Sequence, residues 1–111
     1  MRAGSLTKRV TILRAESSVN DYNEAVMTWG EFCSVWAREE PISDSERFRA
    51  GETLANRKSR FTIRHSADVS SVDPRDRLRF DGRDWDIEGV KSAGAHGESI
   101  EITATARAET P

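Results

Sequence analysis

The stretch from residue 60 to residue 90 decides the fold, with RFTIRH at 60–65, RLRF at 77–80 and RDWDIEGV at 83–90. In each segment apolar side chains alternate with polar ones. A period of two places successive side chains on opposite faces, so each segment predicts a strand with one buried face. Asp81-Gly82 separates the last two segments at the spacing of a two-residue hairpin, whose turn needs positive φ at both central residues. This is the strongest structural signal in the sequence.

Further strands are predicted on both sides of this stretch. Residues 6–14 alternate around Val10 and Ile12, and residues 99–106 alternate around Ile100 and Ile102. Residues 15–25 are rich in Ser, Asn and Asp, which favour turns, so we expect a long hairpin loop there. A second hairpin loop is expected at residues 91–97. Closing about six antiparallel strands into a small barrel removes the sheet edges. We therefore predict one all-β domain over residues 1–111, a small closed or partly open β-barrel.

Residues 26–38 predict a long second strand with apolar residues on both faces. Gly30 within it suggests a bulge or bend, which a tightly curled sheet requires. Two interpretations are open: the strand is central and covered on both sides, or one face meets a partner. In the second case the contact candidates are Leu6, Phe32 and Trp36.

Residues 39–59 interrupt the strand pattern. Pro41 cannot donate to a ladder, and residues 43–46 (Ser-Asp-Ser-Glu) match a capping box at the start of a helix. The helix that would follow has Phe48 and Leu54 as its only large apolar residues, with Gly51 between them. We therefore expect a loop with a short helical part, mobile in the free subunit. Insertions of this length in a compact domain are often functional.

Composition argues against several classes of function. Charged residues make up 32% of the chain, and the signs nearly cancel to a formal net charge of −2. A domain that reads duplex DNA alone is usually basic, so strong autonomous DNA binding is not expected. No apolar run approaches the about 20 residues needed to cross a membrane, and the N-terminal residues do not resemble a signal peptide. The lone Cys33 suits a reducing cytosol, as a core side chain rather than a nucleophile.

The sequence offers no positive evidence for catalysis, a metal or another cofactor. The two histidines have no partner at metal-ligand spacing; we expect His65 to face the core and His96 to lie in a loop. Aspartates gather between residues 73 and 86, but interleaved arginines predict a neutralised, salt-bridged surface rather than a calcium site. A basic cluster could contact phosphates, although the solvated face of a strand is the commoner explanation. It comprises Arg57, Lys58, Arg60 and Arg64.

The order of these motifs resembles the head–tail joining, or head-closure, proteins of tailed bacteriophages and prophage-like particles. The similarity begins with AGSL at 3–6 leading into RVTILR at 9–14, followed by Trp29 and VWA at 35–37. It continues through the insertion around Glu46 and FTIRH at 61–65. The remaining pieces are Pro74, DRL at 76–78, FDGRDWDIEGV at 80–90 and IEI at 100–102. The resemblance covers nearly the whole chain.

This resemblance implies a barrel subunit that forms a ring of six or twelve copies at the neck of a virion or phage-like particle. The ring would lie between portal or adaptor proteins above and tail or tail-terminator proteins below. It would retain packaged double-stranded DNA, with the insertion acting as a gate in the channel. An acidic lining would repel phosphate, so closure would be steric. Carried over to this chain, the gating residues are Glu39, Glu40, Ser43, Asp44, Glu46, Arg47, Arg49 and Glu52. Such a subunit would be made in the bacterial cytoplasm and would not contact a membrane.

Two other classes of function stay open. A small barrel can bind single-stranded nucleic acid through aromatic platforms in a basic groove. Here aromatic residues are few, Phe61 and Trp85 are expected in the core, and the net charge is slightly negative. A hydrolase would need a catalytic constellation, for which Asp84 or Asp86 would be the residues to test, and none is apparent.

Overall fold

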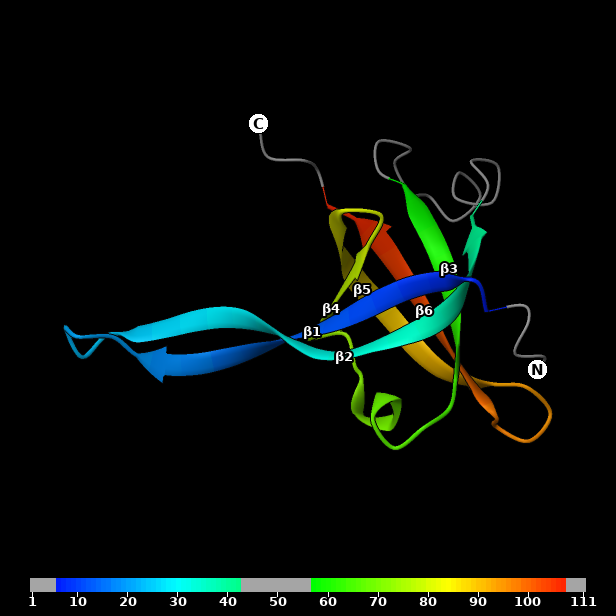
Figure 1. Ribbon diagram of the computed structural model, residues 1–111, viewed down its shortest axis with the longest axis horizontal. Helices are drawn as coiled ribbons and strands as arrows, with labels where there is room; N and C mark the ends of the chain where they lie inside the picture. The colour runs from blue at the N-terminus through cyan, green and yellow to red at the C-terminus, as the bar shows by residue number, and fades with distance from the viewer. Residues whose placement is uncertain (1–5, 43–56, 108–111) are drawn as a thin grey trace.

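The computed structural model describes residues 6–42 and 57–107, which form a closed barrel of six antiparallel strands (Figure 1). The order around the barrel is β1-β2-β3-β6-β5-β4. The bounds are β1 (Lys8–Val19), β2 (Ala25–Pro41), β3 (Lys58–Arg64), β4 (Arg77–Phe80), β5 (Arg83–Ala93) and β6 (Ser99–Ala106), with a 3-10 turn, η2 (Val69–Ser71), between β3 and β4. The prediction of a small all-β barrel is confirmed.

The core fills the barrel with the inward side chains of the alternating strands. Trp85 and Phe61 are fully buried, and their rings meet edge to face with centroids 5.3 Å apart. Each fully buried aliphatic or aromatic side chain contributes about 1.5–3 kcal/mol. The crossing between β3 and β4 also adds to the core, because Val69 and Val72 are buried. The remaining large members are Val10, Ile12, Ile63, Leu78, Ile87, Ile100 and Ile102.

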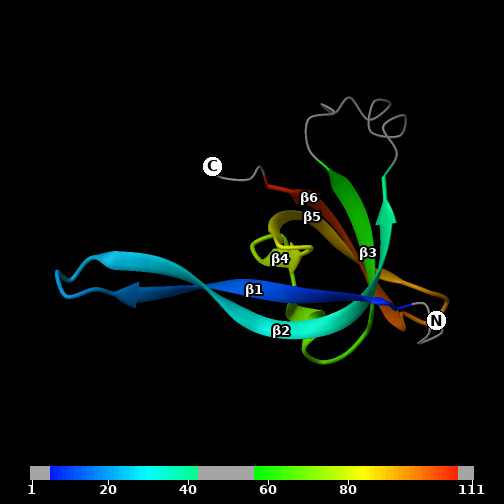
Figure 2. The same ribbon diagram turned by 45° about the horizontal axis from the view of Figure 1, so that its top comes forward.

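The barrel closes through a short contact between its first and fourth strands. β1 pairs with β4 only at Thr11, Ile12 and Leu13. Beyond this point β1 continues with β2 alone, from the pair Ala15–Trp29 to the pair Val19–Ala25. Residues 15–30 thus form a two-stranded ribbon, here called the arm, which projects away from the barrel in both views (Figures 1 and 2).

The arm corrects the prediction of a long hairpin loop over residues 15–25. Both strands extend further than their alternation indicated, and the turn is confined to residues 20–24. Asn20 organises that turn, since its side-chain oxygen accepts hydrogen bonds from the backbone amides of Tyr22 and Glu24, both at 2.9 Å. The pattern was missed because an arm exposed on both faces has no buried side to impose a period of two.

A bulge lies in β2 at Phe32, two residues beyond Gly30, where a bulge or bend was predicted. Ile12 pairs with Cys33 and Leu13 with Glu31, so Phe32 is the extra residue. Gly30 instead pairs regularly with Arg14. A bulge increases local twist and bends the strand, and this one lies where the ribbon leaves the barrel.

The Asp81-Gly82 turn is confirmed. Its φ angles are 58° and 74°, both in the left-handed region, as a two-residue turn of this type requires.

Several strand boundaries differ from those predicted from the sequence. β2 extends to Pro41 and β3 begins at Lys58, so both Glu39 and Glu40 lie in a strand. β5 runs to Ala93, which shortens the loop predicted at 91–97. His65 is exposed just after β3 and does not face the core.

Candidate assembly surfaces

The first candidate surface is the end of the barrel from which the insertion leaves. The amide of Ile42 donates a hydrogen bond to the carbonyl of Lys58 at 3.0 Å, one step beyond the pairing of Pro41 with Ser59. The two ends of the insertion therefore lie side by side. The predicted gating residues Ser43, Asp44, Glu46, Arg47, Arg49 and Glu52 lie outside the described residues.

Arg57 connects three elements at this end. Its guanidinium donates to the Glu39 carboxylate at 2.8 Å and to that of Asp81 at 3.4 Å, and it lies 5.3 Å from the centre of the Trp85 ring. Glu39 has only 9% of its side chain exposed, and Ser59 also donates to it at 2.9 Å. The Glu39 carboxylate is thus neutralised within the barrel end, whereas Glu40 is exposed.

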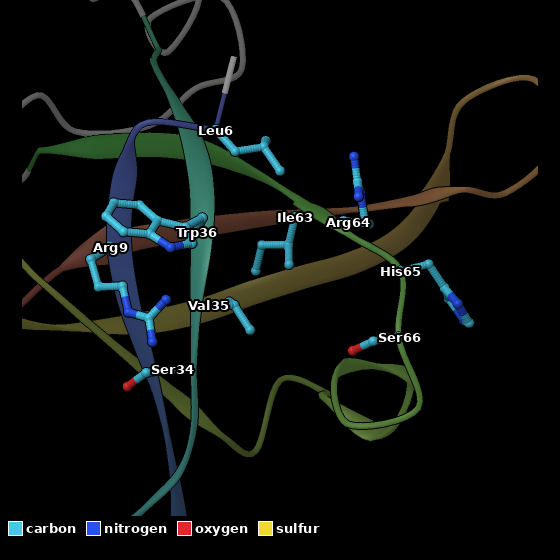
Figure 3. A pocket seen from close by; sticks show the side chains of 9 residues that line it. All are labelled: Leu6, Arg9, Ser34, Val35, Trp36, Ile63, Arg64, His65 and Ser66. Carbon is cyan, nitrogen blue, oxygen red and sulfur yellow. The ribbon is translucent and has the colours of Figure 1, made fainter. Parts of the chain in front are cut away.

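The second candidate surface is an apolar groove of about 570 Å³ at the start of β1 and the end of β3 (Figure 3). Its apolar residues are Leu6, Val35, Trp36 and Ile63; Arg9 and Arg64 also line it. The structure thus brings together two of the predicted contact residues, Leu6 and Trp36. The indole of Trp36 is 52% exposed, with the guanidinium carbon of Arg9 5.2 Å from its ring centre.

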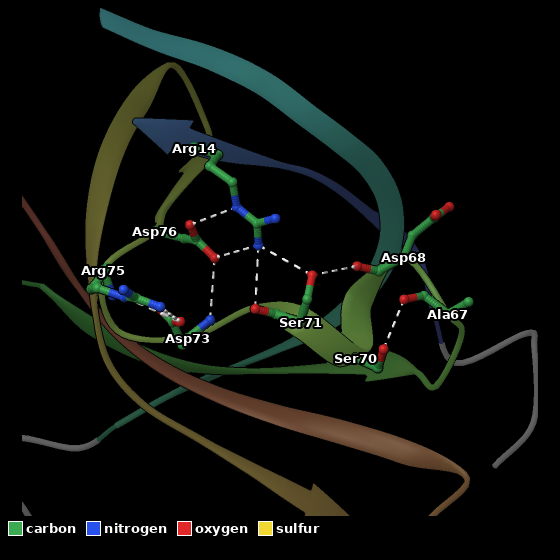
Figure 4. Close-up of polar contacts among 8 residues, drawn as sticks. All are labelled: Arg14, Ala67, Asp68, Ser70, Ser71, Asp73, Arg75 and Asp76. Carbon is green, nitrogen blue, oxygen red and sulfur yellow. Dashed lines mark hydrogen bonds and ion pairs between the residues drawn. The ribbon is translucent and has the colours of Figure 1, made fainter. Parts of the chain in front are cut away.

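Phe32, the third predicted contact residue, lies elsewhere. Its ring is 38% exposed and is covered by the guanidinium of Arg14 at 3.8 Å. Arg14 also binds both carboxylate oxygens of Asp76, at 3.1 and 3.0 Å, and the carbonyl of Ser71 at 3.2 Å (Figure 4). This network ties the crossing before β4 to β1 at the root of the arm.

The arm is a surface that the sequence did not reveal. Val19 is 65% exposed, Tyr22 84% and Met27 67%, all on a ribbon outside the barrel. In the sequence, the turn residues around Asn20 were the available signal for the arm, because they fit a tight hairpin better than a long loop. Contiguous exposed apolar side chains often mark interaction sites.

The chain is similar in sequence to a known protein family. Residues 1–107 match the sequence profile of a family described as phage head completion protein. The chain belongs to the phage head completion protein family. It is therefore a structural virion component that assembles with other virion proteins, as the motif order predicted. No protein of curated function is detectably similar to it in sequence.

Solved structures that share the fold of this head completion protein include the following two. The solution structure of protein SF1141 from Shigella flexneri 2a has a TM-score of 0.76 and 25% identity, and covers 99% of this chain and 100% of its own. A chain in the virion of a native gene transfer agent particle has a TM-score of 0.64 and 22% identity, covering 90% of this chain and 93% of its own.

The described part of the head completion protein shows no group of side chains typical of a metal site. Within residues 6–42 and 57–107, no group of three His, Cys, Asp or Glu side chains could hold a metal ion. Burial raises the pKa of the Cys33 thiol, which disfavours the nucleophilic thiolate. Over the same residues, no helix is long and apolar enough to cross a membrane.

The predicted charge pattern is largely confirmed on the surface of the barrel. Arg75 pairs with Asp73 at 2.8 Å, and Arg79 pairs with Asp84 at 3.0 Å. Asp76 is the exception, because it is buried. The basic cluster is also partly neutralised, with Lys58 pairing with Glu88 at 2.6 Å and Arg60 with Glu101 at 3.8 Å. Phe61 and Trp85 are buried as predicted, so neither offers a platform for nucleic-acid bases.

Proposed function

We propose that this head completion protein forms a ring at the neck of a phage or phage-like particle, where it closes the DNA channel and docks the tail. The family match over residues 1–107 is the observation that carries the proposal. The shared fold of a chain in a gene transfer agent virion supports the same place in a particle. The ring would contain six or twelve copies, with portal or adaptor proteins on one side and tail proteins on the other. Its subunits would be made in the bacterial cytoplasm.

We place the gate at the insertion between β2 and β3. The base of this segment supports the assignment, since the Ile42–Lys58 hydrogen bond and the Glu39–Arg57 ion pair fix its two ends together. A closed barrel with a fixed base can hold a segment out toward a central channel without losing its own fold.

The charge of the segment supports a steric gate. Arg57 neutralises Glu39, so the acidic surplus comes from the residues that follow. Over residues 40–56 these are Glu40, Asp44, Glu46 and Glu52, against Arg47 and Arg49. Four acidic and two basic side chains give this segment a net charge of −2. A ring of such segments would repel phosphate, so DNA could pass without adhering.

Replacing residues 43–56 with a short Gly-Ser linker tests the gate. The fixed base lets a short linker span the gap, so we expect the barrel to fold and the subunit to enter particles. We expect those particles to lose packaged DNA or to fail to join tails, measured by nuclease sensitivity and electron microscopy. A matched control is His96→Ala in the exposed β5–β6 loop. Particles that contain the shortened subunit yet retain DNA and join tails normally would refute the gating role.

A further inference from the structure

We propose that the arm of one subunit docks into the apolar groove of a second copy of this chain. The inference rests on the proposed ring and specifies the contact that would build it. The arm, residues 15–30, is the donor element, and the groove around Leu6, Val35, Trp36 and Ile63 is the acceptor.

The outer apolar side chains of the arm are exposed, whereas Trp29 at its root is covered by the Arg77 guanidinium, 4.1 Å from the centre of its ring. Tyr22 at the turn is 84% exposed, with Val19 and Met27 nearby at 65% and 67%. A two-stranded ribbon is at best marginally stable alone in water. Packing these side chains against another surface would stabilise the ribbon and remove apolar area from water.

The groove has a volume and a lining that suit a tyrosine side chain. Its volume of about 570 Å³ lies in the range of sites that enclose small ligands or side chains. Its walls are apolar at Val35, Ile63 and the half-exposed Trp36. Ser34 and Ser66 also line the groove and could bond a phenol hydroxyl. A tyrosine, with an apolar ring and one polar tip, suits such a site.

Charge identifies the occupant as a second copy. The arm contains Glu16, Asp21 and Glu24 and no Lys or Arg. Among the described residues, the groove is lined by Arg9 and Arg64 and by no acidic side chain. Within residues 6–42 and 57–107, neither of these arginines forms an ion pair. Opposite charges would therefore favour arm against groove, whereas two arms would repel each other.

The positions of arm and groove favour a head-to-tail arrangement. The arm lies at one end of the β1–β2 ribbon (Figure 1). The groove residues Arg9 and Trp36 pair near the other end, next to the pair Lys8–Ala37. A contact between two different patches leaves one of each free on every dimer, so the same contact can repeat until a ring closes. A self-complementary patch would stop at two copies.

Cross-linking in assembled particles tests the contact. In a Cys33→Ser background, Val19→Cys places a thiol on the arm and Ser66→Cys places one at the groove; both substitutions leave Tyr22 and the charges in place. With a short bis-maleimide reagent we expect products at multiples of the subunit mass when both thiols are present. The control pairs Val19→Cys with Asp86→Cys, on the exposed face of β5. We expect at least about a tenfold lower yield from it.

Two other results would overturn the proposal. Linkage of the arm thiol to a different virion protein would show that the arm has another partner. Equal yields from Ser66→Cys and Asp86→Cys would show no preference for the groove. In both cases, particles that still contain the subunit in several copies would leave the ring proposal standing. Particles without the subunit would instead refute the proposed function itself.

Charge reversal gives a second, independent test. We expect Arg9→Glu with Arg64→Glu to lower the cross-linking yield about tenfold or more, because like charges would then face each other. Adding Asp21→Lys and Glu24→Lys to the same chain should restore the yield. Circular dichroism checks that each variant is folded. If the quadruple variant is folded but its cross-linking yield does not recover, the assigned pairing of arm and groove is contradicted.

Discussion

Single arginines fix the ends of strands in this barrel. Arg57 links Glu39 on β2 to Asp81 in the β4–β5 turn and covers the Trp85 ring. Arg14 links β1 to the crossing before β4 through two hydrogen bonds to Asp76. Both pairings join residues far apart in the chain, and both involve a carboxylate with less than a tenth of its side chain exposed. Removing either arginine would leave a mostly buried acceptor short of donors.

Arg57→Ala should lower the free energy of unfolding by about 1–3 kcal/mol, the usual cost of leaving a buried polar group without its partner. Urea denaturation followed by circular dichroism measures the change. Arg75→Ala is the matched control, because Arg75 is 91% exposed and its pair with Asp73 lies on the surface. Its effect on the free energy of unfolding should be much smaller than that of Arg57→Ala. Equal urea denaturation midpoints for Arg57→Ala and Arg75→Ala would contradict the role given to Arg57.

Asp73 should show a pH-dependent contribution to stability. Hydrogen bonds from the Arg75 side chain and backbone amide lower its pKa below the ordinary value of 3.8. A carboxyl with a lowered folded pKa stabilises the protein above 3.8, and this contribution is lost as the pH falls through the folded pKa. We therefore expect the stability difference between wild type and Asp73→Asn to shrink on acidification. In an NMR titration, the Asp73 pKa should rise toward 3.8 in Arg75→Ala, and an unchanged pKa would contradict this assignment.

Among the elements, turns and bulges decide where strands start, bend and end. The Asp81-Gly82 turn reverses the chain in two residues because both adopt positive φ. The bulge at Phe32 lies where the β1–β2 ribbon leaves the barrel wall. Asn20 holds the far turn of the arm through side-chain hydrogen bonds rather than through packing.

Two glycine substitutions separate backbone strain from packing. A Cβ at Gly82 or at Gly30 would meet no heavy atom within 4 Å, so neither substitution creates a clash. Gly82 has φ of 74°, however, and Gly82→Ala should therefore cost about 1–2 kcal/mol. Gly30→Ala, without positive φ, should be neutral or stabilise by up to about 1 kcal/mol. Thermal or urea unfolding of both variants measures these changes. Equal losses of stability in Gly82→Ala and Gly30→Ala would show that φ is not the deciding factor.

At the scale of the whole molecule, the barrel is a scaffold for two extensions. The insertion leaves between β2 and β3, and the arm leaves between β1 and β2. No residue of the arm belongs to the hydrophobic core. The extensions can therefore serve assembly while the barrel carries stability.

Excising the arm should leave the barrel folded. Joining Ala15 to Trp29 through Asn-Gly replaces residues 16–28 with a two-residue turn between residues that already pair. We expect the free energy of unfolding to change by less than about 1 kcal/mol, because only exposed or half-exposed side chains are removed. Urea denaturation measures this. A barrel that no longer folds would show that the arm is part of the scaffold.

The sequence by itself determined the strands whose faces differ in environment. Alternation in residues 60–65, 77–80 and 99–106, with Asp81-Gly82 as a turn, supported the prediction of a small antiparallel barrel, closed or partly open, because burial of one face imposes a period of two. Only the tertiary structure decided the rest. The arm is exposed on both faces and leaves no period, while the groove and the Arg57 contacts join residues distant in sequence. Such features depend on which strands become neighbours around the barrel, and local residue patterns do not record that pairing.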